Sequence, residues 1–202
     1  MIDRVMIVVG AGDSVRFGTD KLMTPVAGRP VVAHTVAAVV DHVDRCILVC
    51  RQDQIDTLAA LGLGAELVPG GPSRTASEMA GLNAIGGPAA LIGIHDGARP
   101  LVTPSLIEIL FETAGLVGGA IPVLDPALPL IGRSGLAPVH RAVVAQTPQV
   151  FHGEPLLAAF DAAATAGHEA QDTAEIAQRF GTLEIEAIPG DPANIKVTRP
   201  ED

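Results

Sequence analysis

Near the start of the chain, the stretch VMIVVGAGDSVRFGTDK runs from an apolar segment into a glycine-rich turn. Gly10 and Gly12 have the spacing of the first two glycines of a dinucleotide fingerprint, but Val15 stands where the third belongs. A Walker loop is also excluded, because no Gly-Lys-Ser/Thr follows. Backbone N–H groups in such a turn can bind an anion, and two cations follow, Arg16 and Lys21. The turn therefore suits a nucleoside triphosphate, and an ordinary strand-to-loop turn with surface cations remains the alternative.

A second glycine pair precedes a predicted helix in the stretch PGGPSRTASEMAGL. The main chain of Gly70 and Gly71 can approach a flat base closely, because neither residue has a side chain. Arg74 and Ser77 lie in the first turns of the helix, and the Ser77 hydroxyl can form a hydrogen bond with the edge of a base.

The stretch IGIHDGARP ends a predicted buried strand in His95, Asp96 and Arg99. In open α/β sheets, ligands bind at the carboxyl ends of the strands. Asp96 is therefore well placed to hold a divalent metal ion. The alternative is a solvated aspartate that caps a turn and pairs with Arg99.

Strand-length apolar runs alternate with helical patterns through most of the chain. This rhythm predicts right-handed crossovers and a mainly parallel sheet that is covered by helices on both faces. The predicted strands are 5–9, 45–50, 65–68, 89–95, 117–124 and 183–188, and the predicted helices are 30–41, 52–61, 73–85, 106–114, 154–166 and 172–180.

Two helix starts carry clear capping signals. Thr103 and Pro104 have the types expected at the N-cap and at the first helical position. Asp172 and Glu175 have the spacing of a capping box.

The rhythm breaks between 126 and 149, where prolines occupy positions 126, 129, 138 and 148. Two short pieces there, 137–140 and 143–145, are compatible with strands. The segment is predicted to be either a mobile loop or an arm that leaves the domain to meet a partner.

The composition predicts a single domain, 1–202, with an aliphatic core. The chain has no Trp or Tyr and a net charge of −10, which excludes a stacking platform or a basic face for nucleic acid. No apolar run approaches the roughly 20 residues of a membrane span, so we expect a cytoplasmic protein without membrane association. Cys46 and Cys50 share one face of a predicted strand, which favours buried reduced thiols over a metal pair or a disulfide.

Five ordered motifs together carry a family resemblance: GAGDSVRFG with the following lysine, GGPSRTAS, HDGARP, TPQVF and NIKVTRPED. The chain resembles the 2-C-methyl-D-erythritol 4-phosphate cytidylyltransferases of the non-mevalonate isoprenoid pathway from 5 to 202, and ribitol-5-phosphate cytidylyltransferases share most of these motifs. The resemblance implies an α/β, Rossmann-like nucleotidyltransferase fold, CTP as the donor, a small polyol phosphate as the acceptor and Mg²⁺ as the cofactor. It also implies a homodimer joined by an extended arm, which would be 126–149 here.

The resemblance further implies a role for each matching residue. The triphosphate would lie along Arg16 and Lys21, and the α-phosphate between Lys21 and Lys196. The implied residues are Arg16, Lys21 and Lys196 for catalysis; Ala11, Gly12, Gly70, Gly71 and Ser77 for nucleotide binding; Arg99, Arg141 and Thr147 for acceptor binding; and Asp96 and Asp191 for the metal.

Departures from the family pattern keep other functions open. Pro126 and Gln171 stand where the family has threonines, one of them an acceptor contact, and Ser14 replaces a loop glycine. The alternatives are a cytidylyltransferase for another polyol phosphate, such as ribitol 5-phosphate, and a divergent CTP-binding paralogue with little activity. A dehydrogenase is a further alternative that the glycine spacing disfavours.

Overall fold

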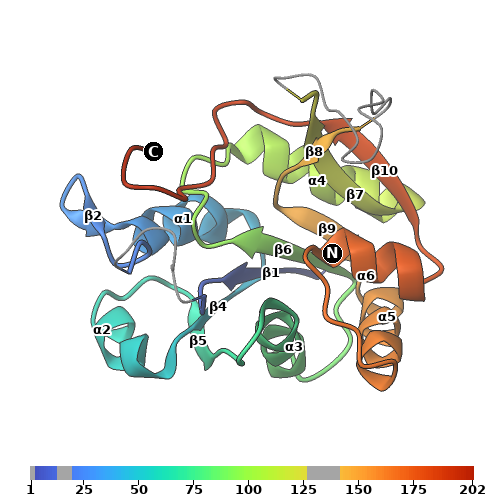
Figure 1. The fold of residues 1–202 in the computed structure, drawn as a ribbon, viewed down its shortest axis with the longest axis horizontal. Helices are drawn as coiled ribbons and strands as arrows, with labels where there is room; N and C mark the ends of the chain where they lie inside the picture. The colour runs from blue at the N-terminus through green and yellow to red at the C-terminus, as the bar shows by residue number, and fades with distance from the viewer. Residues whose placement is uncertain (1–2, 13–19, 127–141) are drawn as a thin grey trace, which may run out of the picture.

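The computed structural model describes residues 3–12, 20–126 and 142–202. Within these ranges the chain forms an eight-stranded sheet with helices packed against it (Figure 1). The sheet strands are β1 (Arg4–Val9), β4 (Arg45–Cys50), β5 (Glu66–Pro69), β6 (Leu91–Asp96), β7 (Gly118–Leu124), β8 (Val144–Ala145), β9 (Gln149–His152) and β10 (Glu184–Pro189). A separate hairpin joins β2 (Pro25–Val26) to β3 (Arg29–Pro30).

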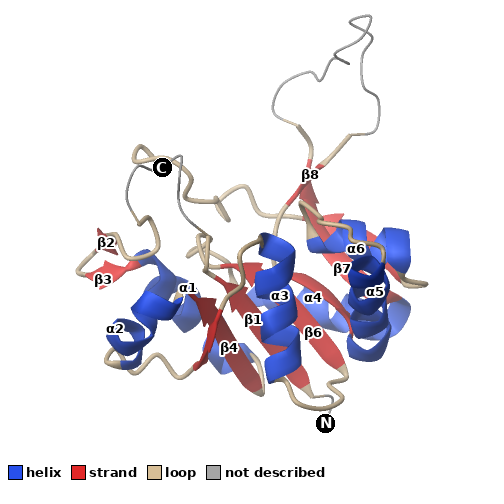
Figure 2. Cartoon of the chain, turned by 60° about the horizontal axis from the view of Figure 1, so that its bottom comes forward, coloured by secondary structure: helices blue, strands red, loops and turns tan. Residues whose placement is uncertain are grey.

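The strand order is β10-β7-β9-β6-β1-β4-β5, and β8 pairs with β7. Strand β1 lies between β4 and β6, and both pairings are parallel (Figure 2). The pairs β4–β5 and β7–β10 are parallel as well, which confirms the prediction of a mainly parallel sheet.

The antiparallel strand β9 was missed in the sequence. It lies between β6 and β7 and pairs antiparallel with both. Its four residues follow Pro148 and are too few to show a strand period. Only the neighbouring strands, which are distant in sequence, give this segment its conformation.

Helices cover both faces of the sheet, as predicted. Figure 1 shows α1 and α4 above β1 and β6, and α3 and α5 below them. The helices are α1 (Val31–Val39), α2 (Ile55–Ala59), α3 (Arg74–Ala84), α4 (Pro104–Val117), α5 (Gly153–Thr165) and α6 (Thr173–Phe180), and 3-10 turns occupy Val40–His42 and Gln52–Gln54. None of the helices in the described ranges is long and apolar enough to span a membrane.

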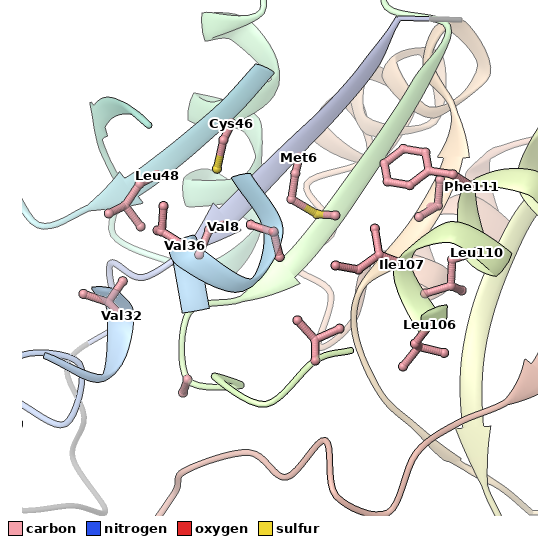
Figure 3. Close-up of a cluster of buried hydrophobic side chains, with 14 of the residues drawn as sticks. Met6, Val8, Val32, Val36, Cys46, Leu48, Leu106, Ile107, Leu110 and Phe111 are labelled. Atoms are coloured by element: carbon pink, nitrogen blue, oxygen red, sulfur yellow. The ribbon is translucent and has the colours of Figure 1, made fainter. Parts of the chain in front are cut away.

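Alternate residues of β1 contribute side chains to two separate hydrophobic cores. Met6 and Val8 pack with α1 and α4 in one cluster (Figure 3), whereas Val5 and Ile7 pack with α3, α5 and α6 in the other. Successive strand side chains point to opposite faces, so one apolar run can serve both layers.

Both predicted N-caps are present, but the predicted capping box is wrong in one partner. The side chain of Thr103 accepts a hydrogen bond from the Leu106 amide, and Asp172 accepts one from Ala174. The Glu175 carboxylate accepts instead from the Gln171 amide at 3.2 Å, and its other oxygen lies 2.7 Å from His168 Nε2.

The expected arm, 126–149, is described only at its ends, and 127–141 lie outside the described residues. Strand β8 pairs antiparallel with β7, and Gln146, Thr147 and Gln149 are buried. Residues 144–149 therefore belong to the body of the domain.

Candidate functional site

A pocket of about 450 Å³ opens at the carboxyl ends of β1 and β6. Four segments that are distant in sequence line it: the turn after β1 with Lys21, the start of α3, the end of β6, and the chain around Lys196. The parallel strands direct their carboxyl ends to one edge of the sheet, so the loops that follow them meet there.

Buried Asp96 is the charge centre of this pocket. Its Oδ1 lies 2.7 Å from the Arg74 guanidinium, and its Oδ2 lies 2.9 Å from Lys196 Nζ and 3.4 Å from Arg99 Nε. Burial disfavours the charged form, but Arg74 and Lys196 outweigh it and hold the pKa of Asp96 well below its usual range. The pair with Arg99 exists, yet the carboxylate is buried rather than solvated.

Two of the three predicted catalytic cations line the same pocket. Lys21 reaches it from the segment before α1, and Lys196 from the carboxyl-terminal segment. Arg16 lies outside the described residues.

The glycine turns are held in place by hydrogen bonds to neighbouring strands. The Gly10 amide donates to Val49 O at 2.7 Å, and the Gly70 amide donates to Cys50 O at 2.8 Å. The two turns touch each other, because a Cβ added at Gly70 would lie 2.2 Å from the Ala11 Cβ. Packing between the loops is therefore enough to require glycine at 70.

Gly12 and Gly71 differ in what surrounds them. A Cβ added at Gly71 would lie 2.5 Å from the Ala76 Cβ, so packing against α3 requires this glycine too. At Gly12, which lines the pocket, an added Cβ would meet no described atom within 4 Å. Its small size leaves space open on the pocket side.

The Ser77 hydroxyl braces the second glycine turn. It donates to Ser73 O at 2.8 Å and accepts from the Gly71 amide at 3.2 Å, and the side chain is buried although it lines the pocket. Ser77 thus fixes the glycine pair, which was expected to contact a base.

Arg74 is a pocket residue that was absent from the predicted site. It joins Asp96 to Glu78, whose Oε1 lies 2.9 Å from Arg74 Nε, and Thr173 Oγ1 donates to the same oxygen at 3.0 Å. Burial of Glu78 outweighs the attraction of Arg74 and raises the pKa of this carboxyl to about 7. The position of Arg74, directly after a glycine turn in the first turn of a helix, is a signal that could have identified it.

Two of the predicted acceptor residues face the protein. Thr147 is buried and points inward, because its Oγ1 accepts from the Asp96 amide at 2.9 Å and lies 3.0 Å from His95 Nδ1. Arg99 donates to Asn194 O at 2.7 Å and is 11% exposed. Arg141 lies outside the described residues.

His95 links these residues through a defined pattern of hydrogen bonds. Its Nε2 lies 3.1 Å from Arg99 O, which can only accept, so Nε2 carries the proton. Burial lowers the pKa of His95 to about 4, so the ring is neutral and its Nδ1 accepts from the Thr147 hydroxyl.

The two predicted metal ligands differ in their surroundings. Asp191 accepts from the Ala193 amide at 2.8 Å and is not among the pocket-lining residues. Across 3–12, 20–126 and 142–202, no three His, Cys, Asp or Glu side chains form a group that could hold a metal. Asp96 alone still fits Mg²⁺, which commonly takes one or two carboxylates together with substrate phosphates.

Known proteins match this chain over nearly its whole length. The model of the IspD family, 2-C-methyl-D-erythritol 4-phosphate cytidylyltransferase, matches residues 3–202. A curated 2-C-methyl-D-erythritol 4-phosphate cytidylyltransferase of Cereibacter sphaeroides (strain ATCC 17029 / ATH 2.4.9) is 40% identical to this chain, and the match covers 97% of this chain and 92% of the relative.

Solved structures share the fold over nearly the whole chain. The 2-C-methyl-D-erythritol 4-phosphate cytidylyltransferase of Thermus thermophilus superposes with a TM-score of 0.81 at 30% identity, covering 100% of this chain and 95% of that one. The 4-diphosphocytidyl-2C-methyl-D-erythritol synthase of Anaerococcus prevotii has a TM-score of 0.86 at 23% identity, covering 99% and 94%.

Proposed function

This chain belongs to the 2-C-methyl-D-erythritol 4-phosphate cytidylyltransferase family, and we propose that it transfers a cytidylyl group from CTP to 2-C-methyl-D-erythritol 4-phosphate, releasing pyrophosphate. Such a nucleotidyltransferase acts in the synthesis of isoprenoid precursors. The observation that carries the proposal is a glycine-walled pocket that Lys21 lines together with Asp96 and its partners Lys196 and Arg74.

The reaction joins two anions, and the pocket supplies the charge that permits it. A phosphate oxygen of the acceptor attacks the α-phosphorus of CTP, the bond from this phosphorus to the bridging oxygen breaks, and its electron pair leaves with pyrophosphate. Lys21 and Lys196 stabilise the negative charge that builds on the α-phosphoryl oxygens, and the family resemblance adds Arg16 as a further cation for the triphosphate. Catalysis is then mainly positioning and preorganised electrostatics.

The nucleotide lies against the glycine turns in this proposal. Main-chain groups of Ala11, Gly12, Gly70 and Gly71 form the surface for the base, and Ser77 keeps the second turn in shape. Asp96 would hold Mg²⁺, and this ion would supply positive charge that neutralises the phosphates.

The acceptor site and the assembly rest on the family resemblance. We place the acceptor phosphate near Arg99 and near Arg141 of a second subunit in a homodimer. Thr147 supports this site from within, because its hydroxyl is engaged with Asp96 and His95.

The decisive experiment is a pyrophosphate-release assay with CTP, Mg²⁺ and a panel of acceptors. We expect the highest kcat/KM with 2-C-methyl-D-erythritol 4-phosphate. A preference for ribitol 5-phosphate would change the assigned acceptor. CTP binding without pyrophosphate release for any acceptor would identify a binding paralogue and overturn the enzymatic proposal.

A further inference from the structure

We propose that Gln146 is a positioning residue that holds the segment from Gly190 to Asn194 so that Lys196 enters the pocket at Asp96. The inference rests on the proposed function, which places Lys196 beside the transferred phosphoryl group. It adds a residue that lies outside the pocket lining and that no motif pointed to.

The side-chain amide of Gln146 is buried and engaged by one short stretch of chain. Its Nε2 donates to Asp191 O at 2.8 Å and to Asn194 O at 3.1 Å, and its Oε1 accepts from the Asp191 amide at 3.0 Å. Both amide hydrogens are used, so the three bonds together fix which end of the amide is oxygen.

The chain passes too close to this amide for a side chain to fit. A Cβ added at Gly190 would lie 2.4 Å from Gln146 Oε1, and the Gly190 amide donates to Val123 O at 2.8 Å. The segment after β10 is thus held between β7 and the Gln146 side chain.

The segment from Gly190 to Asn194 leads directly to Lys196. Asn194 O, one acceptor of Gln146, also accepts from Arg99, and Asn194 Nδ2 donates to Thr147 O at 2.8 Å. Two residues further on, Lys196 Nζ lies 2.9 Å from Asp96 Oδ2, and the next amide, Val197, donates to Ala98 O. The backbone is therefore fixed on both sides of Lys196.

Gln146 and Thr147 control the two halves of the Lys196–Asp96 pair. Gln146 holds the segment that leads to Lys196, and the Thr147 hydroxyl accepts a hydrogen bond from the backbone amide of Asp96. A lysine side chain is a flexible stem with a point charge, so the place where its backbone starts determines where its ammonium group can reach.

The test compares Gln146→Met, Lys196→Met and the double variant in the CTP-dependent assay. Gln146→Met keeps the length of the side chain but removes its donors and its acceptor. We expect kcat to fall roughly 10- to 100-fold, since a displacement of about 1 Å in a catalytic group can cost about 10²-fold. In the Lys196→Met background the same change should alter kcat less than about 2-fold, because residues that act through one group are not additive.

A matched control separates positioning from general destabilisation. Arg45 also donates to main-chain carbonyls, Ile85 O and Ala84 O. It lies at the amino-terminal end of β4, whereas the pocket lies at the carboxyl ends of the parallel strands β1 and β6. Arg45→Met should lower the melting temperature and leave kcat unchanged in both backgrounds. If Gln146→Met does not fold, Gln146→Glu, which keeps the acceptor and loses both donors, should show the same non-additivity.

The outcomes distinguish the two proposals. A near-wild-type kcat for Lys196→Met would contradict the proposed function itself. Two results with an impaired Lys196→Met variant would overturn the positioning role and leave the proposed function standing. One is an unchanged kcat in Gln146→Met, and the other is a kcat in the double variant that falls by the product of the two single effects.

Discussion

At the scale of single residues, one carboxylate organises the pocket. Asp96 contacts Arg74, Arg99 and Lys196, and Arg74 and Lys196 keep its pKa low although it is buried. Each cation comes from a different segment, so the charge of Asp96 also ties the walls of the pocket together. A buried charge is tolerated in this way only when partners of opposite sign surround it.

Lys21→Ala tests the catalytic role that we propose for Lys21, which lines the pocket. We expect kcat to fall about 10²–10³-fold, as on loss of one preorganised donor to the transition state. Arg29→Ala is the matched control, because Arg29 is an exposed cation nearby that does not line the pocket. Steady-state pyrophosphate release measures both variants, and a near-wild-type rate for Lys21→Ala would remove this lysine from the mechanism.

The glycines allow packing to be separated from ligand contact. Gly70→Ala places a Cβ against Ala11 and should lower the free energy of unfolding by about 1–3 kcal/mol. Gly12→Ala meets no described atom within 4 Å, so the unfolding free energy should change much less, while the Kd for CTP rises. Urea unfolding and calorimetric CTP titration give the two readouts. Unchanged CTP affinity in Gly12→Ala would show that the nucleotide does not approach this position.

At the scale of elements, α3 joins the pocket to α6. Its first turn carries Arg74 toward Asp96, and one turn later Glu78 accepts from Thr173 at the start of α6. The helix therefore links α6 to the charge centre through the buried Glu78 and the partly exposed Arg74. In an isolated helix the i, i+4 pair of Arg74 and Glu78 would contribute little stability. In the folded protein, removing one partner leaves the other without its counter-charge in a buried place, which is destabilising.

Glu78→Gln should change how stability depends on pH. The folded-state pKa of Glu78 is about 7, above its ordinary value of 4.5, so the folded protein binds more protons than the unfolded chain between these values. The Glu78 contribution is therefore fully present below about pH 4.5 and is lost as pH rises through 7, by an amount on the order of 3 kcal/mol.

Urea unfolding at several pH values between 4.5 and 8 measures this dependence. The unfolding free energy of the wild type minus that of Glu78→Gln should decrease as pH rises across this range. Parallel curves for the two proteins would contradict the raised pKa.

At the scale of the whole molecule, two hydrophobic cores lie on the two faces of the sheet, and both cysteines lie in one of them. Cys46 and Cys50 are free, buried and clustered with Met6 and Leu48 on the α1–α4 face. The molecule carries a net charge of −10, so the triphosphate site that we propose depends on the local convergence of the cations that line the pocket.

The thiols should report global opening. Burial raises the pKa of Cys46 to about 12. The pKa of Cys50 is also raised, mainly by burial and to a smaller extent by the negative charge of Asp53. A thiol reagent at pH 8 should therefore react with almost no thiol in the native protein and with two per chain in guanidinium chloride. Fast reaction of one native thiol, assigned with Cys46→Ala and Cys50→Ala, would contradict the packing of β4.

The sequence alone determined the layered α/β fold, since period, capping residues and glycine turns are local signals. It also placed Asp96 at a strand end and gave Lys21 and Lys196 as candidates for one pocket. Only the tertiary structure inserted β9 between β6 and β7, turned Thr147 inward, paired Arg74 with Asp96 and placed Gln146 against the segment that leads to Lys196. The physical reason is that these features depend on partners that are distant in sequence, and buried hydrogen-bonding groups take the conformation that satisfies them.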